Sequence, residues 1–67
     1  NRHSEALEDL RRAAELAPGV ARFSYVYAVA LNSLGDPSAA LQVLEDAAVR
    51  HPDDPDIAAF LEMLQAD

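Results

Sequence analysis

Cysteine, tryptophan and lysine are all absent from this sequence of 67 residues. Without cysteine the chain can form neither disulfides nor thiolate zinc sites, and it has no thiol nucleophile. Only four residues are aromatic, and β-branched residues are scarce. Since sheets are rich in those two residue classes, this composition favours close-packed helices over strands.

Basic residues are also few: 5 Lys and Arg stand against 12 Asp and Glu, a formal net charge of −7. Nucleic acids and anionic membranes both attract cationic surfaces, so we expect neither as a partner. No apolar run approaches the roughly 20 residues of a membrane span. The chain opens with neither an initiator Met nor a signal-peptide pattern, which indicates a piece of a longer protein. Heavy use of Ala and Arg without Lys is typical of a bacterial source, in either cytoplasm or periplasm.

Helix-breaking residues divide the chain into four apolar-periodic stretches, at about 4–16, 20–34, 37–50 and 55–65. The first ends before Pro18-Gly19, and the second ends at Gly35, which suits a left-handed C-terminal cap. Asp36 and Asp54 each precede a proline, an arrangement typical of an N-cap followed by the first helical residue. Because short connections force neighbouring helices to run antiparallel, the sequence predicts a single all-α domain of four antiparallel helices.

An internal repeat at an offset of 34 residues is the most informative pattern. Seven residues recur at this offset, namely Ser4, Ala6, Leu7, Leu10, Ala13, Ala14 and Pro18. Their spacing is that of one helical face. Farther along the chain, residues that are 34 positions apart are both apolar but not identical, as are Phe23 and Ile57. The repeating unit is therefore two helices long.

Residues 21–54 resemble one complete tetratricopeptide repeat, a helix–turn–helix unit of 34 residues. The residues that match the family pattern are Ala28, Gly35, Asp36, Ala40, Leu44, Ala47 and Pro52. The resemblance implies an α-solenoid fragment with right-handed superhelical stacking. It divides the chain into the second helix of a preceding repeat (3–18), a full repeat (20–52) and a terminal capping helix (55–66).

Three positions depart from the family pattern. Ser24 and Leu31 stand where the family usually has Trp and Tyr, and we expect Phe23 and Tyr27 to supply the missing bulk. Glu62 occupies a place that is normally small because a following helix presses against it. Since burying a carboxylate costs several kcal/mol, we expect Glu62 to face solvent, as in a capping helix.

The first helix has no partner helix before it in these residues, although it presents Leu7, Leu10 and Leu16. Two interpretations are open. A preceding helix has been cut away, or the exposed face pairs with another chain.

The sequence gives little indication of a catalytic site. Ser4 lies beside His3, but adjacent helical residues point about 100° apart, and no phosphate-binding loop or nucleophile elbow is present. We therefore expect no enzymatic activity. Charged pairs spaced four apart, such as Glu8 with Arg12, indicate a solvated helix face.

A compact set of metal-ligating residue types surrounds the last connection, namely His51, Asp53, Asp54 and Asp56. Calcium loops wrap around the ion and usually need a glycine, whereas two prolines stiffen this segment and it has no glycine. Helix capping explains Asp54 and Asp56 better. We expect no metal and no cofactor.

The resemblance also implies a binding surface. In this family the first helices line a concave surface, and the second, fifth, ninth and twelfth places of each repeat point into it. Here those places are Arg22, Tyr25, Val29 and Asn32, with Asp56, Ala59 and Met63 in the last helix. By spacing, the first four share a helix face opposite the apolar stripe of Phe23, Tyr27, Ala30 and Leu34.

These residues predict a non-catalytic interaction module that binds a peptide or helix of a partner protein through apolar anchors, with Arg22 and Asn32 fixing its orientation. The family's clamp for a C-terminal carboxylate is not expected, because it needs lysine and has asparagine where this chain has Val29. Two alternatives stay open. Tyr25 and Val29 merely cover neighbouring helices of the parent protein, or the chain is a structural module that forms a homo-oligomer through its first helix.

Overall fold

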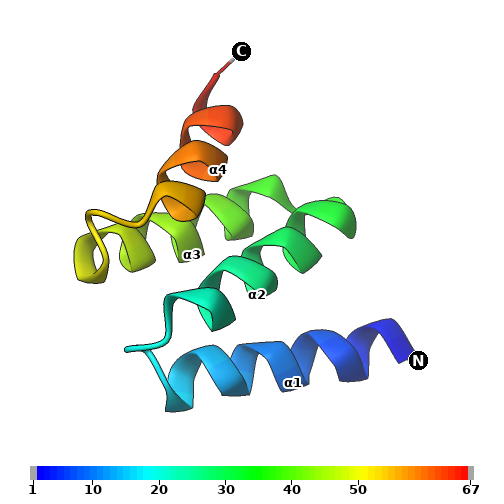
Figure 1. Ribbon diagram of the computed structural model, residues 1–67. Coiled ribbons are helices and arrows are strands. Elements are labelled where there is room, and N and C mark those ends of the chain that lie inside the picture. The colour runs from blue at the N-terminus through cyan, green and yellow to red at the C-terminus, as the bar shows by residue number, and fades with distance from the viewer. Residues whose placement is uncertain (1, 67) are drawn as a thin grey trace.

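Four helices make up the computed structural model, which describes residues 2–66 apart from the side chain of His3. They are α1 (Arg2–Leu16), α2 (Ala21–Ser33), α3 (Pro37–Arg50) and α4 (Pro55–Gln65), and residues 2–66 contain no strand. Figure 1 shows α1, α2 and α3 side by side, each antiparallel to the next, with α4 set against α3. The prediction of an all-α helical repeat fragment is confirmed.

The starts of α3 and α4 are fixed by local capping, as predicted. The Asp36 side chain accepts a hydrogen bond from the backbone N–H of Ala39 at 3.1 Å. The Asp54 side chain accepts two, from the N–H groups of Asp56 and Ile57, each at 3.0 Å. Each aspartate thereby satisfies N–H donors that have no partner within the helix.

The two ends of α2 are set by backbone conformation rather than by a side-chain cap. Val20 is the N-cap in an extended conformation, so α2 begins at Ala21, one residue later than predicted. At its other end the chain reverses through Gly35, whose φ of 87° lies in the left-handed region that favours glycine. The prediction for Gly35 is confirmed.

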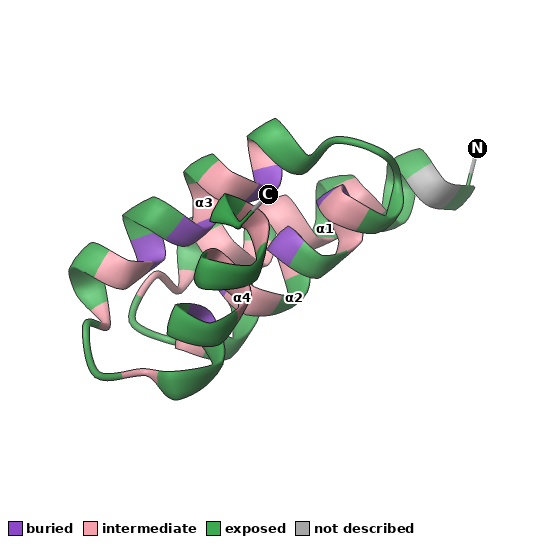
Figure 2. Ribbon diagram, turned by 90° about the horizontal axis from the view of Figure 1, so that it is seen from above, coloured by how far each residue is buried: buried purple, intermediate pink, exposed green. Residues whose placement is uncertain are grey.

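The core is a single buried cluster at the centre of the three C-terminal helices (Figure 2). It consists of Ala28, Leu31, Ala40, Leu44, Ala47 and Ile57. The three alanines, which match the family pattern, are fully buried. No residue of α1 belongs to this buried set within the described part of the chain.

The most deeply buried face of α2 differs from the predicted stripe. Its buried side chains are Ser24, Ala28 and Leu31, whereas Phe23 and Leu34 are 39% and 48% exposed. Helix α2 contacts α1 on one side and α3 on another, so it is apolar around much of its circumference. Apolar spacing alone therefore could not indicate which side is covered most completely.

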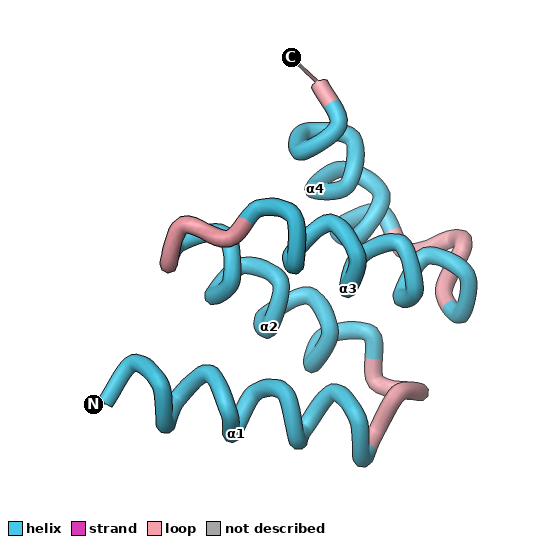
Figure 3. The backbone as a smooth tube through the Cα atoms, turned by 180° about the vertical axis from the view of Figure 1, so that it is seen from behind, coloured by secondary structure: helices cyan, strands magenta, loops and turns pink. Residues whose placement is uncertain are grey.

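The connections after α1 and α3 lie at the same end of the molecule (Figure 3). They are joined by a hydrogen bond of 2.9 Å between Nε2 of His51 and the backbone carbonyl oxygen of Pro18. Because a carbonyl oxygen can only accept, Nε2 donates, and the ring ties together two loops that are 33 residues apart in sequence.

None of the described helices combines the length and the apolar character that crossing a membrane requires.

Candidate functional site

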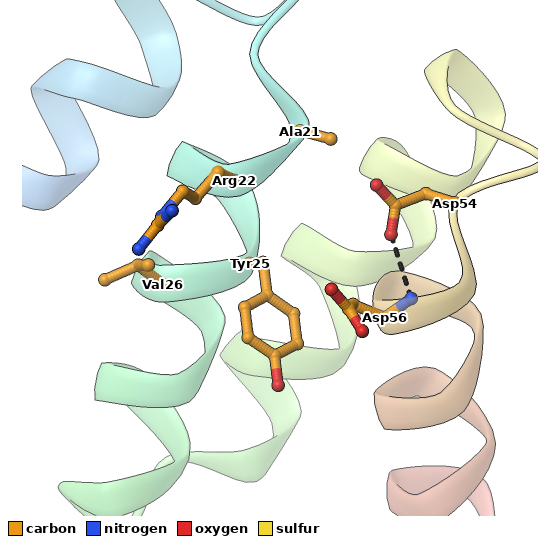
Figure 4. A pocket seen from close by; sticks show the side chains of 6 residues that line it. All are labelled: Ala21, Arg22, Tyr25, Val26, Asp54 and Asp56. Carbon is orange, nitrogen blue, oxygen red and sulfur yellow. Dashed lines mark hydrogen bonds between the residues drawn. The ribbon is translucent and has the colours of Figure 1, made fainter.

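Three of the predicted site residues line one pocket between α2 and α4. Arg22 and Tyr25 come from α2 and Asp56 from the first turn of α4, and the pocket has a volume of about 390 Å³. Figure 4 shows the Tyr25 ring between the two helices, with Asp56 on its α4 side. Arg22 and Asp56, which occupy equivalent repeat positions, thus line the same pocket.

Tyr25 also has a structural role in this pocket. Its ring meets the ring of Phe60 edge to face, with centroids 5.8 Å apart and an interplanar angle of 63°. The side chain is half-buried and packs against the core cluster. This aromatic pair joins α2 to α4, and it leaves part of the Tyr25 ring exposed to the pocket.

Opposite charges occupy the two sides of the Tyr25 ring. The Arg22 side chain extends alongside Val26, whereas Asp54 and Asp56 lie on the other side (Figure 4). The Asp54 carboxylate is engaged by two backbone N–H groups of α4, so Asp56 is the acidic side chain more available to a ligand. A bound segment can therefore meet a cation and an anion across one aromatic surface.

The remaining predicted residues do not line this pocket, but they lie farther along the same two helices. Val29 and Met63 are 36% and 56% exposed. Ala59 is exposed and Asn32 is half-buried. We refer to the surface defined by Arg22, Tyr25, Val29, Asn32, Asp56, Ala59 and Met63 as the α2–α4 face.

Comparison with protein families identifies the helical repeat that this chain contains. The family model described as tetratricopeptide repeat matches residues 1–64. The chain belongs to the tetratricopeptide repeat family. Repeats of this family generally mediate protein–protein interaction and are not catalytic. Neither the curated proteins nor the solved structures gave a match.

Sequence reasoning missed three residues that line the pocket of this tetratricopeptide array, namely Ala21, Val26 and Asp54. A signal was present for two of them. Val26 lies one helical turn after Arg22, and Asp54 lies two residues before Asp56, so each is adjacent to a residue that was predicted. The repeat pattern identifies only selected helix positions, whereas a pocket is lined by all of the side chains that surround it.

Two of the residues considered for metal binding, His51 and Asp54, have other contacts. Among the described residues, no three His, Cys, Asp or Glu side chains gather in a way that could hold a metal ion. The His51 ring contacts Pro18, and Asp54 caps α4. The side chain of His3, which was considered beside Ser4, lies outside the described part of the chain.

Ion pairing on α1 uses Arg11 rather than Arg12, which was the predicted partner of Glu8. The Arg11 guanidinium contacts the Glu8 carboxylate, and it donates hydrogen bonds of 2.8 and 2.9 Å to Glu15. The hydrogen bonds from Arg11 lower the pKa of Glu8, and those same bonds raise the pKa of Arg11. These pairs are exposed and lie on α1, which contributes no residue to the α2–α4 pocket, and exposed ion pairs of this kind contribute little to stability.

Proposed function

We propose that this module binds a peptide or short helix of a partner protein on the α2–α4 face, the surface that corresponds to the concave side of the family's arrays. The observation that carries the proposal is the exposure of Val29 and Met63 on the two helices that also form a pocket lined by Arg22, Tyr25 and Asp56. Exposed apolar side chains bordered by charges are typical of surfaces that bind another protein.

The charges around the pocket indicate the chemistry of the ligand. An apolar anchor of the ligand covers Val29 and Met63, while Arg22 and Asn32 orient its backbone through hydrogen bonds. Asp56, together with the net charge of −7, disfavours a strongly acidic peptide. The expected ligand is therefore neutral or basic, with one or two large apolar residues.

A library of random peptides displayed on phage tests this proposal and does not require that the partner be identified first. Peptides selected on the chain should lose at least tenfold in affinity when Met63 or Val29 is changed to Glu. Val49→Glu is the matched control, because Val49 is apolar and 83% exposed but lies on α3. Selected peptides that bind all three variants equally would overturn the proposal.

A second candidate function is self-association through α1. It is favoured by an apolar pocket of about 300 Å³ between α1 and α2, lined by Ala6, Leu7, Leu10, Ala30, Ser33 and Leu34. Sedimentation at several concentrations separates the two functions. A dimer that dissociates on Leu10→Glu and persists on Met63→Glu would support self-association, whereas a monomer at every concentration contradicts it.

A further inference from the structure

The negative charges in the pocket between α2 and α4 have no cationic partner among the described residues. Asp54 and Asp56 line this pocket together with one basic residue, Arg22. The ion pairs of residues 2–66 are those that Arg11 forms on α1, and neither aspartate takes part in them. The carboxylates of the pocket are therefore available to a cation that a ligand brings.

The orientation of Arg22 explains why it does not neutralise the two aspartates. Its side chain extends beside Val26, whereas Asp54 and Asp56 lie on the other side of the Tyr25 ring (Figure 4). The carboxylate of Asp56 points from α4 toward that ring. The pocket thus has a cationic side on α2 and an acidic side on α4, with the aromatic ring between them.

The Asp54 cap leaves one carboxylate oxygen for a ligand. Both of its backbone hydrogen bonds, from the N–H groups of Asp56 and Ile57, go to the same oxygen, Oδ1. Within residues 2–66, no hydrogen bond reaches Oδ2 of Asp54 or the side chain of Asp56. The acidic side of the pocket therefore presents acceptors on two residues to whatever enters it.

The ring of Tyr25 is a second feature of the pocket, independent of the carboxylates. Phe60 meets this ring edge to face, at a centroid distance of 5.8 Å, and thereby holds its orientation. The Tyr25 side chain is half-buried, and its remaining surface lines the pocket. An aromatic face attracts cations, because the π electrons make it the negative part of the ring. The ring on α2 and the carboxylates on α4 thus favour the same kind of group.

Other kinds of side chain fit this pocket poorly. An apolar side chain would remove the two carboxylates from water without giving them a partner. An acidic side chain would be repelled by them. A basic side chain meets both requirements, because its charge pairs with the carboxylates while its methylene groups lie against the ring.

We propose that the pocket between α2 and α4 receives a basic side chain of the bound partner segment. The cationic group lies over the Tyr25 ring and donates hydrogen bonds to Asp56 and to Oδ2 of Asp54. Repulsion from Arg22 confines it to the α4 side of the ring. This inference rests on the proposed function, that a peptide or short helix binds the α2–α4 face, and it adds the contact that selects the partner.

Peptides selected from the random phage library provide the probe. Each peptide that Met63→Glu weakens should contain a basic residue whose replacement by glutamine lowers affinity for the unchanged chain at least tenfold. The same replacement should lower affinity for the Asp56→Asn variant no more than threefold, because the partner of the basic side chain is missing there. Asp56→Asn keeps the backbone N–H that bonds Asp54, so the cap of α4 is retained.

Asp53→Asn is the matched control. It removes the same charge from an exposed residue beside Asp54 that does not line the pocket. In this variant the replacement in the peptide should still cost at least tenfold, which separates a contact in the pocket from the effect of net charge. Higher salt should weaken the peptides that contain the basic residue more than their glutamine counterparts.

The failure of this inference can be told apart from the failure of the proposed function. Selected peptides that bind the chain equally well after Met63→Glu and Val29→Glu would contradict the proposed function, and this inference with it. Peptides that depend on Met63 but contain no basic residue would overturn only the basic side chain. A basic residue that contributes equally on the unchanged chain and on Asp56→Asn would do the same.

Discussion

Tyr25 and Phe60 meet edge to face across α2 and α4, with ring centroids 5.8 Å apart. This contact holds the candidate binding face together, because it joins the two helices that supply all of its residues. Tyr25→Ala and Phe60→Ala should each lower the free energy of unfolding by about 2 kcal/mol, since both rings are partly buried. The aromatic contact itself should appear as a coupling of about 1 kcal/mol between the two substitutions.

Urea unfolding of the two single variants and the double variant, followed by circular dichroism, measures that coupling. Tyr25→Phe is the control, because it keeps the ring and removes only the hydroxyl group. Losses in the two single variants that simply add in the double variant would mean that the rings are in contact without stabilising each other.

The side chain of Asp54, which caps α4, should contribute more to the free energy of unfolding than the exposed side chain before it. Asp54→Ala removes the acceptor of two backbone hydrogen bonds and should lower the free energy of unfolding by about 1 kcal/mol. Asp53→Ala, one residue earlier, should change it by less than about 0.5 kcal/mol. Asp54→Asn should restore most of the loss, because asparagine also caps well. Equal effects of Asp53→Ala and Asp54→Ala in chemical denaturation would contradict this assignment.

Substitution by alanine should destabilise the fold at Gly35 but not at Gly19. Gly35 has a φ of 87°, so Gly35→Ala should cost about 1 kcal/mol of stability. At Gly19 φ is not in that region and no atom lies within 4 Å of a new Cβ, so Gly19→Ala should be neutral or should stabilise the fold by up to about 1 kcal/mol. Thermal midpoints of the two variants provide the measurement. A lower midpoint for Gly19→Ala than for Gly35→Ala would show that the left-handed backbone of Gly35 does not determine the response.

The hydrogen bond between His51 and the carbonyl of Pro18 should stabilise the array by tying two connections together. His51→Ala should lower the free energy of unfolding by about 1 kcal/mol and should increase hydrogen exchange at Val20, whose N–H bonds within the same loop. His51→Gln retains a donor of similar reach and is the matched control. If Gln and Ala give the same loss, the donor is not what stabilises the loops.

The contribution of Glu8 should depend on pH. Contact with Arg11 holds the pKa of Glu8 below its ordinary value of 4.5 in the folded chain. The folded state therefore favours the ionised form, and the ion pair stabilises the fold above pH 4.5 and loses this effect as the pH falls through the lowered pKa. The thermal midpoint of Glu8→Gln should lie below that of the unchanged chain at pH 7 and approach it at pH 3.

High salt should reduce the same difference, because both side chains are exposed. Asp9→Asn is the control: it removes a neighbouring carboxylate that takes part in neither of the Arg11 ion pairs. A difference between the unchanged chain and Glu8→Gln that stays constant from pH 7 to pH 3 would rule out the ion pair as its cause.

Much of the candidate site could be predicted because the repeat fixes which helix position points in which direction. Arg22 and Tyr25 are one turn apart on α2, and the equivalent turn of α4 carries Asp56, so stacking the two helices brings the three together. The orientation of Arg22 beside Val26, and the placement of the two carboxylates on the other side of the Tyr25 ring, could not be predicted. They depend on the spacing and angle between α2 and α4, which no local pattern contains.

The sequence by itself determined where α3 and α4 begin and where α2 ends, because a cap or a left-handed turn involves only residues a few positions apart. Asp36, Gly35 and Asp54 are examples. Only the tertiary structure decided which of two matching residues is buried. Leu10 and Leu44 have the same side chain on the same kind of helix, yet only Leu44 is fully buried. Burial depends on the neighbours that a residue acquires in space, and α2 covers α3 where no described helix covers the matching side of α1.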